Sequence, residues 1–176
     1  MRRAKCDKED DCSRVDDTDT KLPPARRNVQ TTEIPIRQED SRLLVISSLF
    51  FLVPGCCAAA YQLYFYFVVS FITTVVSMNY WRHAIDGTRR HWDLFTAKAS
   101  FVIYFISGCF FVRDVMELTV GIPGCLLIIL FYNLGLRFWD LDSPNWVYFH
   151  AGFHFWVAFE QGWVIYCGIQ IGTHNS

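Results

Sequence analysis

The sequence lacks charge over a long stretch: no Asp, Glu, Lys or Arg occurs from Leu43 to Trp81. The hydrocarbon core of a bilayer takes about 20 apolar residues per helix, so this stretch is enough for two crossings. Inside lipid the backbone has to satisfy its own hydrogen bonds, which favours helix. The missing charge therefore excludes an ordinary water-soluble domain and predicts an integral membrane protein whose neighbours are lipids.

Other absences narrow the function. The sequence contains no Gly-rich phosphate-binding loop, no Gly-x-Ser-x-Gly elbow and no His-Glu-x-x-His motif. The formal net charge is −1 and no segment is strongly basic, which excludes a nucleic-acid partner. None of the seven cysteines forms a Cys-x-x-Cys pair, so no disulfide framework is predicted. Because no apolar run occurs in the first forty residues, we expect no cleavable signal peptide.

The charges that are present gather near the N-terminus. Residues 1–42 hold ten of the sixteen Lys and Arg and ten of the seventeen Asp and Glu. This segment has few large apolar residues, and Pro23, Pro24 and Pro35 oppose regular helix. Such a composition predicts a disordered tail over residues 1–41.

The rest of the chain predicts an all-α transmembrane bundle of about five spans. The expected spans are 42–58, 61–80, 93–112, 118–138 and 146–170, followed by a short end at 171–176. The first span is expected to end near Pro54-Gly55, where a tight turn would lead into the second. A four-span bundle, with the first run tilted or re-entrant, is the main alternative.

The cations predict the orientation. Five crossings put the tail, the loop after the second span and the end of the fourth span on one side of the membrane. Nine cations belong to these regions: Lys21, Arg26, Arg27, Arg37, Arg42, Arg82, Arg89, Arg90 and Arg137. Only Arg113 falls on the other side. Since cytoplasmic loops carry the excess of Lys and Arg, we expect a cytoplasmic N-terminus.

Several polar side chains are expected at this inner face, although they are far apart in sequence. Ser77 ends the second span and His83 follows it, while Asp93 begins the third. His150 and His154 lie near the start of the fifth. Polar groups within apolar spans are costly, so each of them is a candidate functional residue.

His150 and His154 are four residues apart and would project from one face of a helix. Two neutral imidazoles at this spacing suit a zinc ion, for which His83 or Asp93 would supply a third ligand. In the other interpretation, both imidazoles hydrogen-bond to carbonyl and hydroxyl groups at the interface. The sequence leaves both interpretations open.

The order of Ser77, Asp93 and the pair in His150-Ala-Gly-Phe-His154 resembles the CREST superfamily, which includes the alkaline ceramidases. The resemblance implies a membrane-embedded, zinc-dependent amide hydrolase acting on lipids. In that family a His follows the Ser by four residues; here Trp81 holds that position and His83 is the nearest substitute.

Two functions follow from the sequence. The first is a multi-pass membrane protein without catalytic activity, whose inner polar cluster structures the bundle or binds a lipid. The second is a lipid amide or ester hydrolase. In it, zinc is held by His150, His154 and His83, and the catalytic water is positioned by Ser77 and Asp93. A metal would lower the pKa of that water to about 7 and polarise the carbonyl group.

Overall fold

The computed structural model describes residues 37–84 and 87–174, and every secondary-structure element in these ranges is helical. The predicted all-α fold is therefore confirmed. The elements are α1 (Gln38–Ser48), the short 3₁₀ helix η1 (Leu49–Phe51), α2 (Leu52–Ala60), α3 (Tyr64–Arg82), α4 (Thr88–Phe111), α5 (Val115–Asp140) and α6 (Trp146–His174). Of the tail predicted over 1–41, residues 1–36 lie outside the described part. Helix α1 already begins at Gln38.

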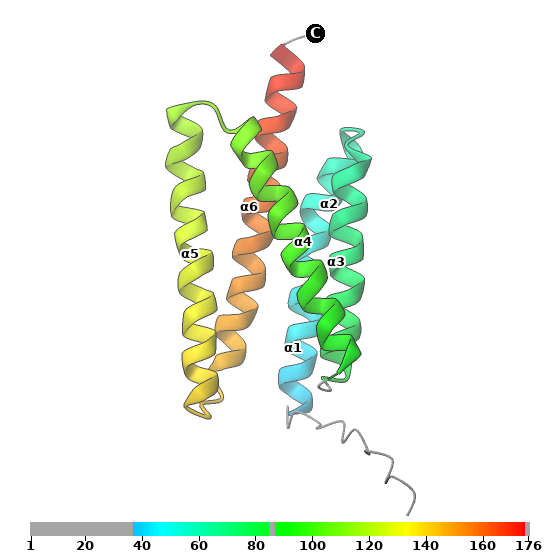
Figure 1. The fold of residues 1–176 in the computed structure, drawn as a ribbon, viewed down its shortest axis with the longest axis vertical. Coiled ribbons are helices and arrows are strands. Elements are labelled where there is room, and N and C mark those ends of the chain that lie inside the picture. Colours follow the sequence, from blue (N-terminus) through cyan, green and yellow to red (C-terminus); the bar gives the residue numbers. More distant parts are fainter. Residues whose placement is uncertain (1–36, 85–86, 175–176) are drawn as a thin grey trace, which may run out of the picture. The chain divides into compact units, whose positions relative to one another are not determined.

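Helices α1, η1 and α2 form one continuous rod, so the described chain makes five rods that run alternately up and down (Figure 1). Helix α6 is central, because it packs against α1, α2, α4 and α5. Helix α3 packs against the α1–α2 rod and against α4. The rod Gln38–Ala60 and the helices α4 and α5 are each long and apolar enough to cross a membrane.

The first rod differs from its prediction at Pro54-Gly55. The helix does not turn there but continues to Ala60. Pro54 is the third residue of α2, directly after the 3₁₀ turn of η1. Within a continuous rod proline removes one hydrogen bond to the preceding turn, and the 3₁₀ turn of η1 lies directly before it, where the helical geometry changes locally. The expected turn at Pro54-Gly55 was therefore wrong.

The chain reverses instead over three residues, Tyr61, Gln62 and Leu63. The amide of Leu63 donates to the carbonyl oxygen of Ala58 at 2.8 Å, and that of Gln62 donates to Ala59 at 3.0 Å. These two bonds define a Schellman motif, which ends a helix with one residue in the left-handed conformation. Gln62, with φ of 62°, holds this position, which glycine usually occupies.

The third span also begins earlier than predicted. Helix α4 starts at Thr88 rather than at 93, after Gly87 with φ of +154°. Arg89 and Arg90, expected in a loop, therefore lie in its first turn. Arginine side chains are long, so their charges can reach water even though their backbone lies in the helix at the edge of an apolar span.

Small and hydroxyl-bearing residues form much of the interior. A Cβ on Gly55 would lie 2.9 Å from that of Ser70, so glycine allows α2 and α3 to approach closely. The Ser70 hydroxyl is 2.9 Å from that of Tyr104 on α4, and the Tyr66 hydroxyl is 2.8 Å from that of Ser107. Small residues and interhelical hydrogen bonds are the usual means of helix association in a membrane, where apolar side chains also face lipid.

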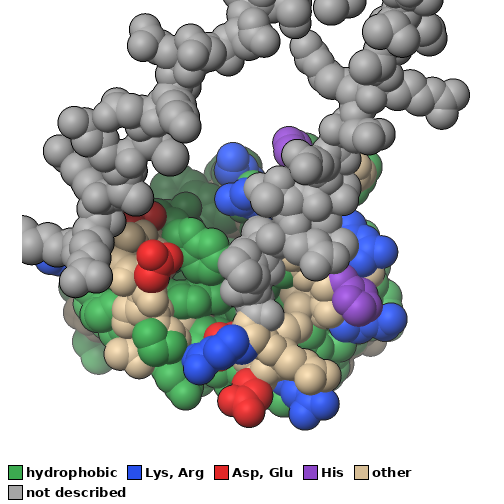
Figure 2. Space-filling view, turned by 90° about the horizontal axis from the view of Figure 1, so that it is seen from below, with side chains coloured by type: hydrophobic (Ala, Val, Ile, Leu, Met, Phe, Trp, Pro, Cys, Tyr) green, Lys and Arg blue, Asp and Glu red, His purple; other side chains and the backbone are tan. Residues whose placement is uncertain are grey.

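Charged side chains gather at the end of the bundle where α1 and α4 begin and α3 and α5 end. Figure 2 shows this end from below, with Arg and acidic side chains on its surface. Its exposed arginines are Arg37, Arg42, Arg82, Arg89, Arg90 and Arg137. At the opposite end, Arg113 is the only cation among the residues described.

Candidate functional site

The candidate site begins with His154, which α6 places in the interior with only 4% of its surface exposed. Its Nδ1 lies 2.9 Å from the hydroxyl oxygen of Ser47 on α1. Ser47 donates its single hydrogen to the carbonyl oxygen of Leu44 at 3.0 Å. With that hydrogen directed at Leu44, the Ser47 oxygen can accept from the Nδ1–H of a neutral His154.

His150 lies one helical turn before His154, and the two ring centroids are 4.8 Å apart. The sequence prediction that both imidazoles share one face of a helix is consistent with this geometry. The buried Trp81 ring of α3 packs on His150 with centroids 4.9 Å apart. Its indole nitrogen has no hydrogen-bond partner in the described part of the chain. The residue that replaces the expected histidine thus makes an aromatic contact with the histidine pair.

Ser77 and Asp93 lie together on the other side of α1. The Ser77 hydroxyl is 3.1 Å from that of Ser48, which donates to the carbonyl oxygen of Leu44 at 2.8 Å. Ser77 also interacts with the Asp93 carboxyl group on α4. Because Ser47 and Ser48 are adjacent and share Leu44 as acceptor, they join the Ser77–Asp93 pair to the histidine pair. We call these six side chains the inner cluster: Ser47, Ser48, Ser77, Asp93, His150 and His154.

His83 does not belong to the inner cluster. It is exposed and caps the C-terminal end of α3, and no hydrogen bond or ring contact described for the chain joins it to His150 or His154. Within residues 37–84 and 87–174, no group of three or more His, Cys, Asp or Glu is arranged to hold a metal ion. The inner cluster pairs two imidazoles, one of which already bonds Ser47, whereas its carboxyl group, Asp93, interacts with Ser77 and is not grouped with them. These donors do not fit a three-ligand zinc site.

Reasoning from sequence missed Ser47 and Ser48, which connect the two halves of the inner cluster. A signal was present, because they are the only polar residues between Leu43 and Val53. Both lie at the end of α1, which packs against α3 and α6, so two adjacent hydroxyl groups reach both helices.

The inner cluster can hold helices together. Its hydrogen bonds join α1 to α6 and α1 to α3, and the Ser77–Asp93 contact joins α3 to α4. A further bond near the same end, from the Ser41 hydroxyl to the carbonyl oxygen of Trp81, measures 2.5 Å. Interhelical hydrogen bonds in membrane proteins contribute about 0.6 to 2 kcal/mol each. The arrangement therefore stabilises one specific packing of four helices.

Comparison with known proteins assigns no family to the chain. No protein-family model, no curated protein and no solved structure matches it. The resemblance to the CREST superfamily stays a prediction, and the interpretation of the site depends on the geometry described above.

Proposed function

We propose that this protein is a non-catalytic integral membrane protein that crosses the bilayer five times, and that its inner cluster holds the bundle together. The observation that carries the proposal is the pairing of buried hydroxyl and imidazole groups across helices. Ser47, Ser48, Ser77 and His154 each have a hydrogen-bonding partner within the protein. This is the role that polar residues most often serve between helices in lipid.

The packing of α3 and α6, the two long helices that are less uniformly apolar, supports the proposal of five crossings. Helix α3 has 19 residues, and at 1.5 Å per residue it extends about 28 Å, close to the thickness of a hydrocarbon core. Helix α6 is longer and lies against both the first rod and α5. A helix enclosed by membrane-spanning neighbours has to share their depth.

We propose that the end where α1 begins faces the cytoplasm, because the exposed arginines gather there and cytoplasmic loops carry the excess of Lys and Arg. With five crossings the C-terminus lies on the opposite side. A C-terminal epitope tag in intact cells should therefore be inaccessible to a cytoplasmic protease and should become accessible from the other face. A tag that the cytoplasmic protease removes would contradict the combination of a cytoplasmic N-terminus with an odd number of crossings.

A lipid hydrolase is the alternative, and metal content distinguishes the two functions. We expect protein purified in detergent to contain no stoichiometric zinc, and His154→Ala to lower stability without changing metal content. About one zinc per chain in the wild type, lost in His154→Ala, would instead favour the hydrolase. Exposed His83→Ala is the matched control, since it removes an imidazole that lies outside the inner cluster.

A further inference from the structure

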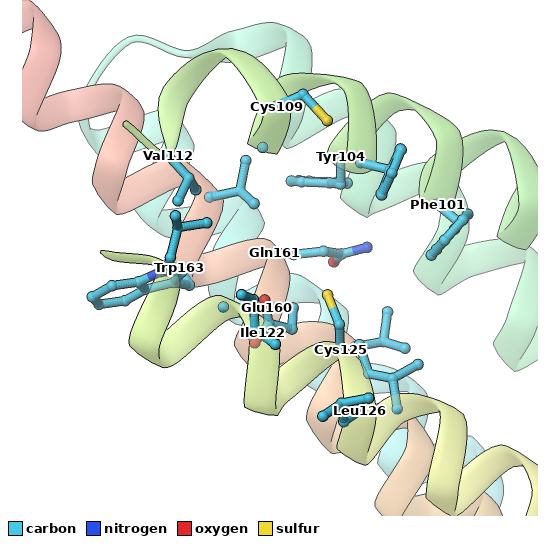
Figure 3. Close-up of a pocket in the computed structure, with 17 residues that line it drawn as sticks. Phe101, Tyr104, Cys109, Val112, Ile122, Cys125, Leu126, Glu160, Gln161 and Trp163 are labelled. Carbon is cyan, nitrogen blue, oxygen red and sulfur yellow. The ribbon is translucent and has the colours of Figure 1, made fainter. Parts of the chain in front are cut away.

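A second polar feature occupies the other half of α6. Glu160 and Gln161 line a cavity of about 530 Å³ between α4, α5 and α6 (Figure 3). Cavities of this size are typical of small-molecule sites. The rest of the lining is mostly apolar and aromatic, and includes Phe101, Phe105 and Trp163. No Lys, Arg or His is among the described residues that form its wall.

Glu160 is 9% exposed, and its carboxyl group lies against Gly124 of α5. A Cβ on Gly124 would overlap that carboxyl group, so α5 provides a recess that only glycine leaves open. One carboxyl oxygen, Oε1, has no hydrogen-bond partner within the described residues. An ionisable group inside an apolar bundle is costly unless something pairs with it.

Gln161 is 3% exposed and points toward α4. Its amide nitrogen donates to the Ser100 hydroxyl at 3.1 Å. The amide oxygen is then left as an acceptor, and it too has no partner in the described part of the chain. Both residues line the cavity, and each has one buried acceptor oxygen without a partner among the described residues.

We propose that this cavity binds a long-chain amine, an amphiphile with a protonated amino group at one end of a hydrocarbon chain. An ammonium group carries three donors and a positive charge, which match the carboxyl group of Glu160 in the cavity wall. The hydrocarbon chain packs against Phe101, Phe105 and the other apolar side chains. A fatty acid would bring a like charge to Glu160, and an alcohol would leave its charge unpaired.

The cavity is accessible to such a ligand from the lipid. Helices α4 and α5 both pack on α6, and the cavity lies between them. An amphiphile can therefore enter from the side without first passing through water. The proposal goes beyond the function proposed above and does not depend on the number of crossings.

The test uses full-length protein in detergent and a photoactivatable analogue of dodecylamine with a diazirine at the far end of its chain. We expect one adduct per chain, mapped to the segments of α4, α5 and α6 that line the cavity. Unlabelled dodecylamine should compete about tenfold or more better than dodecanol or dodecanoate, because a charge-assisted hydrogen bond is lost with either. Equal competition by all three compounds would overturn the proposal.

Two variants locate the site. Glu160→Gln should remove the preference for the amine over the alcohol, whereas Asp140→Asn, which removes an exposed carboxyl group from the end of α5, should leave it unchanged. Gly121→Leu should block labelling, because a Cβ there makes only ordinary contacts and a longer side chain would enter the cavity. Thermal unfolding of each variant reports whether it is folded. If Glu160→Gln is unfolded, the comparison of the three competitors on the wild type and Gly121→Leu still decide the matter.

A second copy of this chain is the competing occupant. Cross-linking of Cys125, which lines the cavity, to Cys125 of another chain would show that a protein surface covers the site. That result, or adducts spread evenly over the outside of the bundle, would overturn the proposal.

Discussion

At the scale of single residues, the inner cluster depends on hydroxyl groups that accept and donate in fixed directions. Ser47 bonds both the Leu44 carbonyl group and His154, so one oxygen atom connects the backbone of α1 with α6. Removing it leaves an imidazole N–H without an acceptor in an apolar interior. The cost of an unmade bond exceeds the gain from a made one.

We therefore expect Ser47→Ala to lower the free energy of unfolding by about 1 to 3 kcal/mol. Ser47→Ala and His154→Ala should be non-additive in a double-mutant cycle, with a coupling of about 0.6 to 1.7 kcal/mol. Equilibrium unfolding in mixed micelles of mild detergent and dodecyl sulfate measures both. Thr96→Ala is the control, because the Thr96 hydroxyl bonds only carbonyl groups of its own helix. Strict additivity would contradict the assigned bond.

Gly124 permits a second contact that can be tested at this scale. Gly124→Ala should destabilise the protein by about 1 to 3 kcal/mol, because the new methyl group overlaps the Glu160 carboxyl group. Shortening the partner in Gly124→Ala with Glu160→Ala should recover much of that loss in the same unfolding measurement. Gly172→Ala, where a Cβ meets nothing within 4 Å, should have little effect. Failure of the double variant to recover stability would contradict the recess.

At the scale of the helices, two of the connections share one geometry. Both α2 and α5 end in a Schellman motif, with Gln62 at φ of 62° and Asp142 at φ of 49° in the left-handed position. Residues other than glycine hold this conformation at a cost of about 1 to 2 kcal/mol. The three-residue turn between α2 and α3 therefore has Gln62 at a position that glycine would hold at lower cost.

This strain predicts a stabilising substitution. Gln62→Gly should raise the free energy of unfolding by up to about 1 kcal/mol, with part of the gain offset by the greater freedom of glycine in the unfolded chain. Thermal inactivation in detergent and equilibrium unfolding should agree on the sign. Gln62→Val should do the opposite, because a β-branched side chain tolerates positive φ least. Destabilisation by glycine would show that the Gln62 side chain makes a contact that outweighs the strain.

The helices also show how far sequence reasoning reaches. The apolar runs predict all five rods because a bilayer requires long uncharged helices, and no packing detail enters that argument. The turn was misplaced because the rod continues through Pro54, with the 3₁₀ turn of η1 directly before it. Ser47 and Ser48 were missed because their partners come from α3 and α6, far away in sequence. His83 was included because distance along the chain does not report that it caps α3 on the exposed side.

At the scale of the whole molecule, the bundle is unequal in its packing. Helix α6 contacts four other rods or parts of rods, whereas α5 packs chiefly on α6, helped by the bond from the Trp163 indole nitrogen to the Glu117 carbonyl oxygen at 3.2 Å. Only 6% of the apolar window of α5 is buried inside the protein, so lipid has to cover the rest. The cavity proposed as an amine site lies along this loosely packed side.

The central position of α6 has a consequence for the order in which the protein is made. Because α5 precedes α6 in the chain, α5 reaches the membrane before the helix on which it packs. The Ser47 hydroxyl group of the first rod likewise has no His154 partner until α6 is present. Assembly of the bundle is therefore a late event. A chain that ends before Trp146 would expose the helix faces that α6 normally covers to the quality-control proteases of its membrane.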